Sequence, residues 1–344
     1  MRLLEFTSLG IYCAPGRFYI DPWRPVERAL ITHAHSDHSR WGMKQYLAHR
    51  VSVPVMKQRL GSGISVQSTD YYETHHINGV TVSFHPAGHI PGSSQIRVEY
   101  KGEVWVASGD YKLGADGIST PFEPVRCHTF ISESTFGLPL YHWKPQAEIV
   151  REINAWWQQC AAEGKTALIY GYALGKAQRI MQAVDESIGP IYVHGAVHSM
   201  NEALREGGLA LRSPQQLTSA VSKAELRGAL VIAPPSGGNE AWLNKLQPCS
   251  TAGASGWMGL RGARRRMAYD RGFVLSDHAD WAQLNTAVEA CQCERVIVTH
   301  GYTSVFARWL QGKGLQAEEA KTEYAGELAE TDAAETVTTD TKTE

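Results

Sequence analysis

Four side chains of the kinds that bind metal ions follow one short apolar run near the start of the chain. The run Ala29–Thr32 leads directly into a segment that contains His33, His35, Asp37 and His38. In extended backbone His33 and His35 point to the same side, because side chains alternate between the faces of a strand. Imidazole and carboxylate ligands suit zinc or a similar divalent ion, and one cluster can serve two ions. The alternative is a polar loop whose histidines bond to the backbone, but the His-x-His-x-Asp-His spacing favours a metal site.

A site for two ions needs further ligands, and candidates stand where later apolar runs end. His89 lies in a turn rich in glycine and proline, and Asp110 follows a glycine, where its carboxylate could bridge two ions. Asp21, immediately before Pro22, is a candidate to accept a hydrogen bond from a ligating histidine and so fix its tautomer. A turn cap before the proline is the alternative role for Asp21.

The composition is that of an ordinary globular enzyme. The chain has 344 residues, 43% hydrophobic and 20% charged, with a formal net charge of −2. This balance argues against a protein that coats nucleic acid, although a local basic groove remains compatible with it. The 6 irregularly placed cysteines form no disulfide framework. We see neither a signal peptide nor an apolar run of membrane-spanning length, and therefore expect a cytoplasmic protein with no membrane partner.

The elements that must position these residues fall into two kinds. Short apolar runs bounded by Gly, Asp, His or Pro predict strands, at residues 18–20, 28–32, 51–53, 80–84, 96–100, 104–107 and 129–131. From about Ala147 the apolar period becomes helical, and a strand at 167–170, a helix at 176–184 and parallel strands at 191–193 and 230–233 follow. This middle block, 140–266, predicts an α/β insert between a first part, 1–139, and a last part, 267–318, of one domain. Residues 319–344 are acidic and predict a disordered tail that activity does not require.

Three residues later in the chain narrow the interpretation. Glu133 lies in Glu-Ser-Thr-Phe-Gly137, His278 lies in Ser-Asp-His-Ala-Asp-Trp281, and His300 follows an apolar strand. With the first cluster and the inserted block, these motifs resemble the β-CASP nucleases of the metallo-β-lactamase superfamily. The resemblance covers the chain to about residue 315 and is strongest to the bacterial DNA ligase-associated exonucleases. It implies an α/β fold, an αββα metallo-β-lactamase sandwich with an inserted α/β β-CASP domain.

The resemblance also implies roles for individual residues. It implies two groups of zinc ligands and one bridging carboxylate: His33, His35 and His89 for one ion, Asp37, His38 and His300 for the other, and Asp110 for both. Glu133 would orient His278, which would protonate the leaving oxygen, and Asp37 is also expected to take part in catalysis. Asp21 would accept a hydrogen bond from a ligating histidine without contacting the ion. Manganese or another divalent ion is expected as a substitute for zinc.

The chemistry expected of such a centre is hydrolysis of a phosphodiester. Two ions about 3.5–4 Å apart polarise a phosphoryl oxygen and lower the pKa of a water, and the metal-bound hydroxide attacks phosphorus in line. General acid catalysis by an imidazole contributes roughly 10²–10⁴-fold. His278 should therefore matter for rate and little for metal content.

The substrate implied by the resemblance is nucleic acid, with a DNA exonuclease in DNA repair preferred. A DNA ligase and a helicase are the implied partners in the same pathway. His300 points the other way, because many DNA-cleaving members have valine there, so an RNA-processing endo- or exoribonuclease is the alternative. A small-molecule hydrolase of the superfamily and a catalytically inactive binding subunit are two further alternatives; the first lacks the later motifs, and the second loses ligands that this chain retains.

Two basic segments are candidates to contact substrate phosphates. Lys176 follows a glycine turn at the start of the predicted helix, and Arg264 and Arg265 belong to the densest basic run, 261–266. Backbone N–H groups at a helix start bind phosphate readily. A glycine turn needed for packing and a solvated loop are the respective alternatives.

Overall fold

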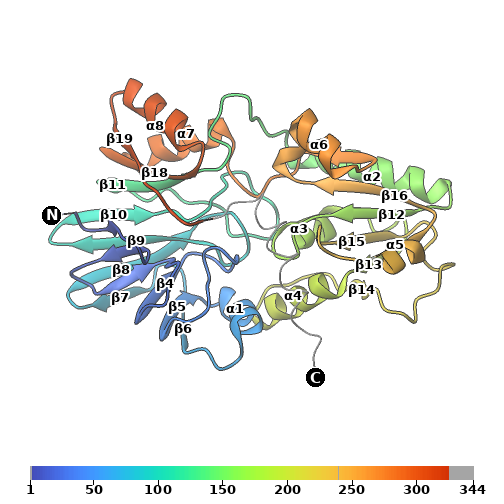
Figure 1. The fold of residues 1–344 in the computed structure, drawn as a ribbon, viewed down its shortest axis with the longest axis horizontal. Helices are drawn as coiled ribbons and strands as arrows, with labels where there is room; N and C mark the ends of the chain where they lie inside the picture. The colour runs from blue at the N-terminus through green and yellow to red at the C-terminus, as the bar shows by residue number, and fades with distance from the viewer. Residues whose placement is uncertain (1, 239, 325–344) are drawn as a thin grey trace.

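The structure, a computed structural model, describes residues 2–238 and 240–324; the side chains of residues 240, 263, 264 and 266 lie outside that description. Two lobes lie side by side (Figure 1). The beginning and the end of the described chain build one lobe, and the middle of the chain builds the other. No helix within the described ranges is both long and apolar enough to cross a membrane.

The first lobe contains two sheets packed face to face. One sheet has the strand order β1 (Glu5–Phe6), β2 (Ile11–Cys13), β3 (Phe18–Ile20), β4 (Arg28–Ile31), β5 (Gln45–His49), β6 (Val66–Thr69). The other has the order β19 (Gln316–Glu319), β18 (Arg295–Gly301), β11 (Thr129–Ser134), β10 (Glu103–Ala107), β9 (Ser94–Tyr100), β8 (Val80–Pro86), β7 (Thr74–Ile77). Alternate residues such as Leu30 and Val82 fill the core between the two sheets.

Helices cover the outer faces of both sheets. Helices α7 (Trp281–Cys291) and α8 (Thr303–Gly312) pack on the second sheet through Leu284 and Phe306. Helix α1 (Ser52–Leu60) packs on the first sheet. The first lobe is thus an αββα sandwich, and the predicted fold class is confirmed.

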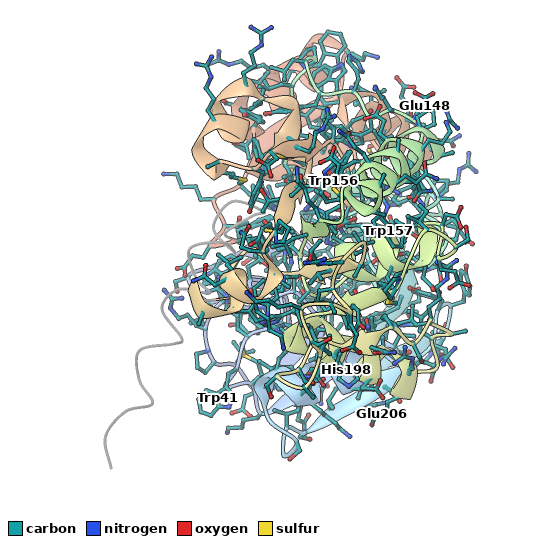
Figure 2. All side chains as sticks on the ribbon, turned by 90° about the vertical axis from the view of Figure 1, so that its right-hand side faces the viewer. Trp41, Glu148, Trp156, Trp157, His198 and Glu206 are labelled. Atoms are coloured by element: carbon teal, nitrogen blue, oxygen red, sulfur yellow. The ribbon has the colours of Figure 1, made fainter. Side chains whose placement is uncertain are left out.

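The second lobe is a parallel sheet with helices on both faces. Its strand order is β14 (Gln215–Gln216), β13 (Ile191–Val193), β15 (Leu230–Ala233), β12 (Thr166–Tyr170), β16 (Cys249–Ala254), β17 (Arg271–Phe273). Its helices are α2 (Gln146–Ala162), α3 (Lys176–Ala183), α4 (Gly195–Glu206), α5 (Glu240–Leu246) and α6 (Arg261–Met267), with a 3₁₀ turn, η1 (Gly256–Gly259). Trp156 and Trp157 of α2, labelled in Figure 2, pack on one face of the sheet with Ile169 and residues of α3 and α4. Leu246 of α5 packs on the other face with Leu168.

Two predicted boundaries need correction. Residues 51–53 were predicted as a strand, but Ser52 begins α1, because Pro54 is tolerated in the first turn of a helix and Val55 faces the core. The insert was predicted to end at 266, but β17 pairs in parallel with β16 and buries Phe273 in the core of the second lobe.

The predicted tail also begins later than residue 319. Glu319 pairs with Val298 in the second sheet, and the backbone N–H of Ala320 donates to the carbonyl of Val298 at 2.9 Å. Residues 320–324 then continue along the first lobe, while 325–344 lie outside the described residues. The acidic composition of this stretch concealed a segment that packs.

Candidate metal centre and adjoining pocket

The first motif occupies the loop that follows β4. The strand ends at Ile31, and a turn closed by the Ser39 N–H on the His35 carbonyl, at 2.8 Å, follows it. Because the chain changes direction there, His33 and His38 lie side by side, with ring centroids 4.2 Å apart, although they are separated by several residues. Both rings are at most 1% exposed.

Asp110 lies at the centre of the predicted ligands. Its Oδ2 atom is 3.6 Å from His33 Nε2, 3.5 Å from His38 Nε2 and 3.8 Å from His89 Nε2. Its Oδ1 atom is 2.8 Å from His300 Nε2. The preceding residue, Gly109, has a φ of +57°, and a Cβ atom there would lie 2.6 Å from the Thr32 hydroxyl oxygen. Glycine at this position therefore allows the carboxylate to approach the β4 loop.

The ligand atoms divide into two groups that share Asp110. His33, His35, His89 and Asp110 place one ligand atom each within 4.8 Å of one another, and so do His38, Asp110 and His300. Asp37 joins the second group, with its Oδ2 atom 3.7 Å from His38 Nε2. We call His33, His35 and His89 the first half-site, and Asp37, His38 and His300 the second half-site. The structure thus brings together the residues predicted as ligands, in the predicted grouping.

Hydrogen bonds from the outer ring nitrogens of the first half-site leave the opposite ring nitrogens free to face its centre. His89 Nδ1 donates to the Asp277 carbonyl at 2.8 Å, and His35 Nε2 donates to the Leu174 carbonyl at 3.2 Å. His35 Nδ1 and His89 Nε2 then lie 3.1 Å apart. Two nitrogens bound to one tetrahedral zinc at about 2.0–2.1 Å each would be roughly 3.3 Å apart. The two rings are therefore arranged as ligands of one ion.

Asp21 lies behind both half-sites. Its Oδ2 atom accepts from His38 Nδ1 at 2.7 Å and from the Thr32 hydroxyl at 2.5 Å. The Thr32 oxygen is in turn 3.0 Å from His33 Nδ1, from which it can accept. The carboxylate is 2% exposed. Asp21 thus orients His38 directly and His33 through one hydroxyl, in the place the sequence predicted for it.

The bulge in the second sheet sets the position of His300. The pairing of β11 with β18 shifts register between Ser132 and Ser134. The Ser134 hydroxyl donates to the carbonyl of His300 at 2.7 Å. A bulge of this kind re-aims the side chain that follows it, and here His300 faces Asp110 across the end of the sheet.

The residues present fit a pair of metal ions. Buried polar atoms are nearly always hydrogen-bonded. In the described part of the chain, however, three ring nitrogens at this point are buried with no hydrogen-bond partner: His33 Nε2, His38 Nε2 and His300 Nδ1. The first two face Asp110. Ring nitrogens that converge on a carboxylate without a hydrogen-bond partner are what a zinc-type ion would satisfy.

Burial and neighbouring charges shift the pKa values of the histidines and of Asp110 in different directions. Burial lowers the pKa of His33 and His89 well below the usual value, so these imidazoles are neutral, as ligands must be. Burial also disfavours the charged form of His38, but the carboxylates of Asp37, Asp110 and Asp21 together raise its pKa to about 10, so an ion bound there would displace a proton. Asp110 has a pKa well below its usual range, because neighbouring histidines outweigh its burial.

Glu133 and His278 form a pair beside the centre. His278 Nδ1 lies 3.1 and 3.0 Å from the two Glu133 carboxylate oxygens, and the carboxylate also accepts from the Tyr111 backbone N–H at 2.7 Å. The His278 ring centroid is 4.6 Å from that of His89. Asp110, Glu133 and His278 also place ligand atoms within 4.8 Å of one another, so a metal-binding role for His278 must be tested separately.

The predicted phosphate contact at Lys176 is wrong as a surface contact. Lys176 is 0% exposed, and its ammonium lies 3.3 Å from an Asp277 carboxylate oxygen. Arg179 donates to the other Asp277 oxygen at 2.9 Å. Burial disfavours the charged form of Asp277, but these two cations outweigh it and lower its pKa. The glycine turn therefore serves packing between the lobes, which was the alternative interpretation.

Asp277 lies in the Ser-Asp-His-Ala-Asp-Trp281 motif and has a role that the motif did not predict. It joins helix α3 of the second lobe to the His89 ring of the first, through its carboxylate and its carbonyl respectively. Its position beside His278 was the one signal available in the sequence. Of the other predicted phosphate contacts, Arg265 lies exposed on α6, and the side chain of Arg264 lies outside the described residues.

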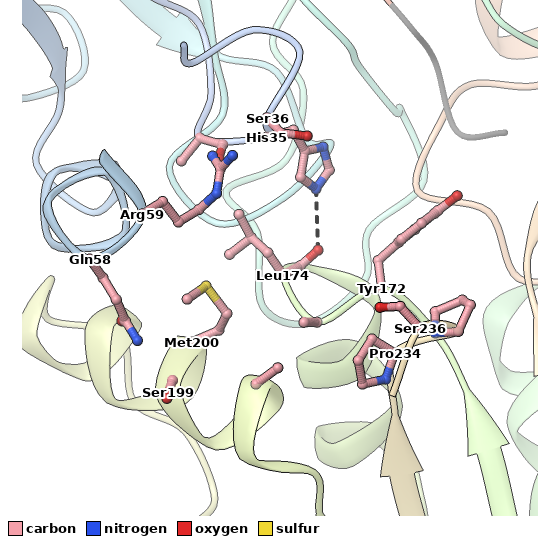
Figure 3. A pocket seen from close by; sticks show the side chains of 14 residues that line it. His35, Ser36, Gln58, Arg59, Tyr172, Leu174, Ser199, Met200, Pro234 and Ser236 are labelled. Atoms are coloured by element: carbon pink, nitrogen blue, oxygen red, sulfur yellow. Dashed lines mark hydrogen bonds between the residues drawn. The ribbon is translucent and has the colours of Figure 1, made fainter. Parts of the chain in front are cut away.

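A pocket opens beside His35, between the two lobes (Figure 3). Its volume is about 460 Å³, which is in the range of sites for small organic ligands. Polar side chains from both lobes line it, among them Arg59, Ser199 and Ser236, together with the apolar Met200. The pocket thus places a ligand-sized space against the first half-site. No sequence motif marked these lining residues.

Tyr324 is a second residue that the sequence analysis missed. Its ring stacks on His38 with centroids 4.3 Å apart and an interplanar angle of 12°, and it meets His300 edge-on at 5.6 Å. Its hydroxyl donates to the Asp21 carbonyl at 3.2 Å. Its one mark in the sequence is that it is a single aromatic residue in an acidic stretch.

No family model matches the chain. A protein of Opitutus terrae named probable DNA ligase is 31% identical over 313 residues, which cover 90% of this chain and 30% of that protein. Endoribonuclease YSH1 of Saccharomyces cerevisiae is 29% identical over 123 residues, 35% of this chain and 16% of that protein. Cleavage and polyadenylation specificity factor 73 of Drosophila melanogaster is 24% identical over 168 residues, 46% of this chain and 24% of that protein. The chain thus spans less than a third of the length of each of these relatives.

Among solved structures, a protein of unknown function from Enterococcus faecalis superposes with a TM-score of 0.60 at 10% identity. The superposition covers 86% of this chain and 79% of that one. At this identity the likeness concerns the fold, and it extends over both lobes of the chain.

Proposed function

The chain belongs to the β-CASP group of the metallo-β-lactamase superfamily, and from this premise we propose that it is a metal-dependent phosphodiesterase that hydrolyses nucleic acid. The observation that carries the proposal is the convergence of His33, His38, His89 and His300 on one buried carboxylate, Asp110. A small-molecule hydrolase is disfavoured, because the second lobe covers the centre and contributes the Leu174 carbonyl to it.

The ligand assignment follows the two half-sites. The first half-site would hold one divalent ion and the second half-site another, with Asp110 available to both. Bound ions of this kind supply polarisation of a phosphoryl oxygen and activation of water. We propose zinc, which suits imidazole and carboxylate donors, with manganese as a substitute.

His278 is the proposed proton donor. Glu133 accepts from His278 Nδ1 and fixes the ring, so that the opposite nitrogen, Nε2, is the one available to deliver a proton to the leaving oxygen. Glu133 is itself fixed, since it is 0% exposed and accepts from the Tyr111 N–H. The pair therefore has a defined direction before a substrate arrives.

DNA is the proposed substrate, cleaved from an end in a repair process. The support is the extent of the similarity: the relative named as a DNA ligase aligns with 90% of this chain, whereas the endoribonuclease aligns with 35%. The pocket beside His35, at about 460 Å³, supports cleavage at an end because it offers space for a terminal nucleotide next to the first half-site. The same relative's name supports a DNA ligase as partner; a helicase has no comparable support.

RNA is the second candidate substrate. The observation in its favour is the local similarity to the endoribonuclease and the presence of His300 within 2.8 Å of Asp110, where it completes the second half-site. Both substrates present the same phosphodiester to the centre, so the geometry of the ligands alone does not separate them.

One experiment tests the proposal. Purified protein of known metal content is given 5′-labelled single-stranded DNA and RNA of matched sequence, and the products are separated on gels, with His33→Ala protein as the control for contaminating nucleases. We expect stepwise shortening of DNA and intact RNA. Cleavage of RNA alone would transfer the proposal to RNA processing, and no cleavage of either by the metal-loaded protein would overturn it.

A further inference from the structure

Residues 320–324, which we call the strap, leave β19 and run to the second half-site. The Ala320 N–H bonds to the carbonyl of Val298, two residues before His300. At the other end, Tyr324 lies against the ring of His38. The strap therefore connects the strand that carries one histidine of the second half-site with the face of the other.

Charged contacts fix the strap to the first lobe. The Glu323 carboxylate accepts two hydrogen bonds from the Arg24 guanidinium, at 2.6 and 3.0 Å. Arg40 donates to the Glu323 carbonyl at 2.5 Å. A bidentate arginine–carboxylate pair restricts direction as well as distance. Glu323 is thus held on both sides, and the next residue, Tyr324, is directed toward the centre.

The Tyr324 ring fills a space between side chains of the centre and of the loop before β4. It stacks on His38 at 4.3 Å and meets Trp23 edge-on at 5.6 Å. Its hydroxyl donates to the carbonyl of Asp21, the residue whose carboxylate holds His38 Nδ1.

His300 explains why such a contact matters. A ligating histidine usually has its second nitrogen held by a hydrogen bond, which fixes the ring. Within the described chain, Nδ1 of His300 has no hydrogen-bond partner, in contrast to Nδ1 of His38 and of His89. The orientation of the His300 ring must then come from packing, and Tyr324 meets it edge-on at 5.6 Å.

We propose that Tyr324 is a positioning residue for the second ion, whose ring holds His38 and His300 in the orientation that binds metal. The inference rests on the proposed metal centre and adds a part of the chain that lies outside every sequence motif. It makes occupancy of the second half-site depend on the strap, while the first half-site, which the strap does not touch through Tyr324, is independent of it.

The test measures metal binding in the absence of any nucleic acid. Metal-free protein is titrated with cobalt(II) chloride while visible absorption is recorded, since that spectrum reports the geometry of the bound ion. We expect Tyr324→Ala to bind one ion as the unsubstituted protein does and a second about 10- to 100-fold more weakly, as for loss of other groups that orient ligands. Tyr324→Phe keeps the ring and should restore both affinity and spectrum.

Controls separate positioning from general stability. Tyr72→Ala removes an exposed tyrosine elsewhere in the first lobe and should change neither binding step. A chain shortened to residue 319 should behave like Tyr324→Ala, and one shortened to residue 330 like the full chain. Arg24→Gln loosens only the exposed anchor of the strap and should weaken the second ion about two- to fivefold; this variant decides the matter if Tyr324→Ala does not fold.

Equal binding of two ions by Tyr324→Ala and the unsubstituted protein would overturn the inference, as would equal weakening of both ions. The outcome is independent of nuclease activity. A protein that binds two ions in a Tyr324-dependent way but cleaves no nucleic acid would retain this inference and lose the proposed function.

Discussion

The first half-site and the second half-site hold their imidazoles by different means. In the first, each ring donates a hydrogen bond to a fixed oxygen, and one of these oxygens, the Leu174 carbonyl, belongs to the second lobe. In the second, His38 has the Asp21 carboxylate, whereas His300 is placed by a bulged strand and by an aromatic neighbour. The second half-site also has the more negative surroundings, which raise the pKa of His38 to about 10.

The contrast indicates that the two half-sites differ in how firmly they bind an ion. A site whose rings are fixed by hydrogen bonds is organised before the ion arrives, and it pays little in ordering when the ion binds. A site fixed in part by packing gains more of its order from the ion itself. We therefore expect the first half-site to retain its ion more firmly when a chelator is present.

The largest effect is expected from a change at Asp110, the residue that the two half-sites share. Asp110→Asn takes away the charge that faces both groups of histidines, so both ions should bind weakly and activity should fall by on the order of 10³-fold or more, equivalent to about 4 kcal/mol. Metal analysis after desalting and a cleavage assay check this. Retention of one ion at full occupancy would show that Asp110 serves a single half-site.

The next largest effect is expected from a change at His278, which should leave both half-sites intact. His278→Ala should keep two ions and lose roughly 10²–10⁴-fold in rate, because it removes the proposed proton donor. Glu133→Gln, which keeps the shape of the Glu133 side chain, should show a smaller loss of the same kind. Loss of an ion from the His278 variant would instead assign that residue to the ligands, in line with its distance of 4.0 Å from Asp110.

A smaller effect, unequal for the two ions, is expected from a change at Asp21, which hydrogen-bonds to the ligands from behind. Asp21→Asn removes the charge that holds His38 directly and His33 through Thr32, so the second ion should weaken about 10- to 100-fold and the first ion less. Competition with a chromophoric chelator measures both steps. If both ions weaken to the same degree, the relay through Thr32 is as important as the direct contact.

The smallest effect should fall mainly on the first half-site. Thr32→Val deletes the hydroxyl near His33 Nδ1 with little change in volume, at a cost of about 1 kcal/mol for one hydrogen bond, or roughly fivefold in affinity. The same chelator competition would reveal it. A larger loss of the second ion than of the first would contradict the assignment of this hydroxyl to the first half-site.

The parts of the molecule that could be predicted from sequence share a local origin. His33, His35, Asp37 and His38 belong to one short motif, and the strands that carry them have a local apolar pattern. The predicted strands at 18–20, 191–193 and 230–233 have the bounds found in the structure for the same reason.

What could not be predicted depends on partners distant in sequence. The charge of Lys176 suggested a surface role, but Asp277, the buried carboxylate that pairs with it, lies far along the chain. Composition alone predicted disorder after residue 318. Glu323 is nevertheless held in place, because Arg24 and Arg40 donate hydrogen bonds to it. The expectation that the whole of residues 319–344 is dispensable is therefore replaced by the opposite expectation for the strap.

One connection between the lobes ties His278 to the second lobe. Strand β17 belongs to the sheet of the second lobe, Leu275 packs in that lobe's core, and His278 follows only three residues later. Any outward swing of the second lobe must draw the chain at Leu275 with it and strain the pairing of His278 with Glu133. The position of His278, the proposed proton donor, is therefore coupled to the position of the second lobe.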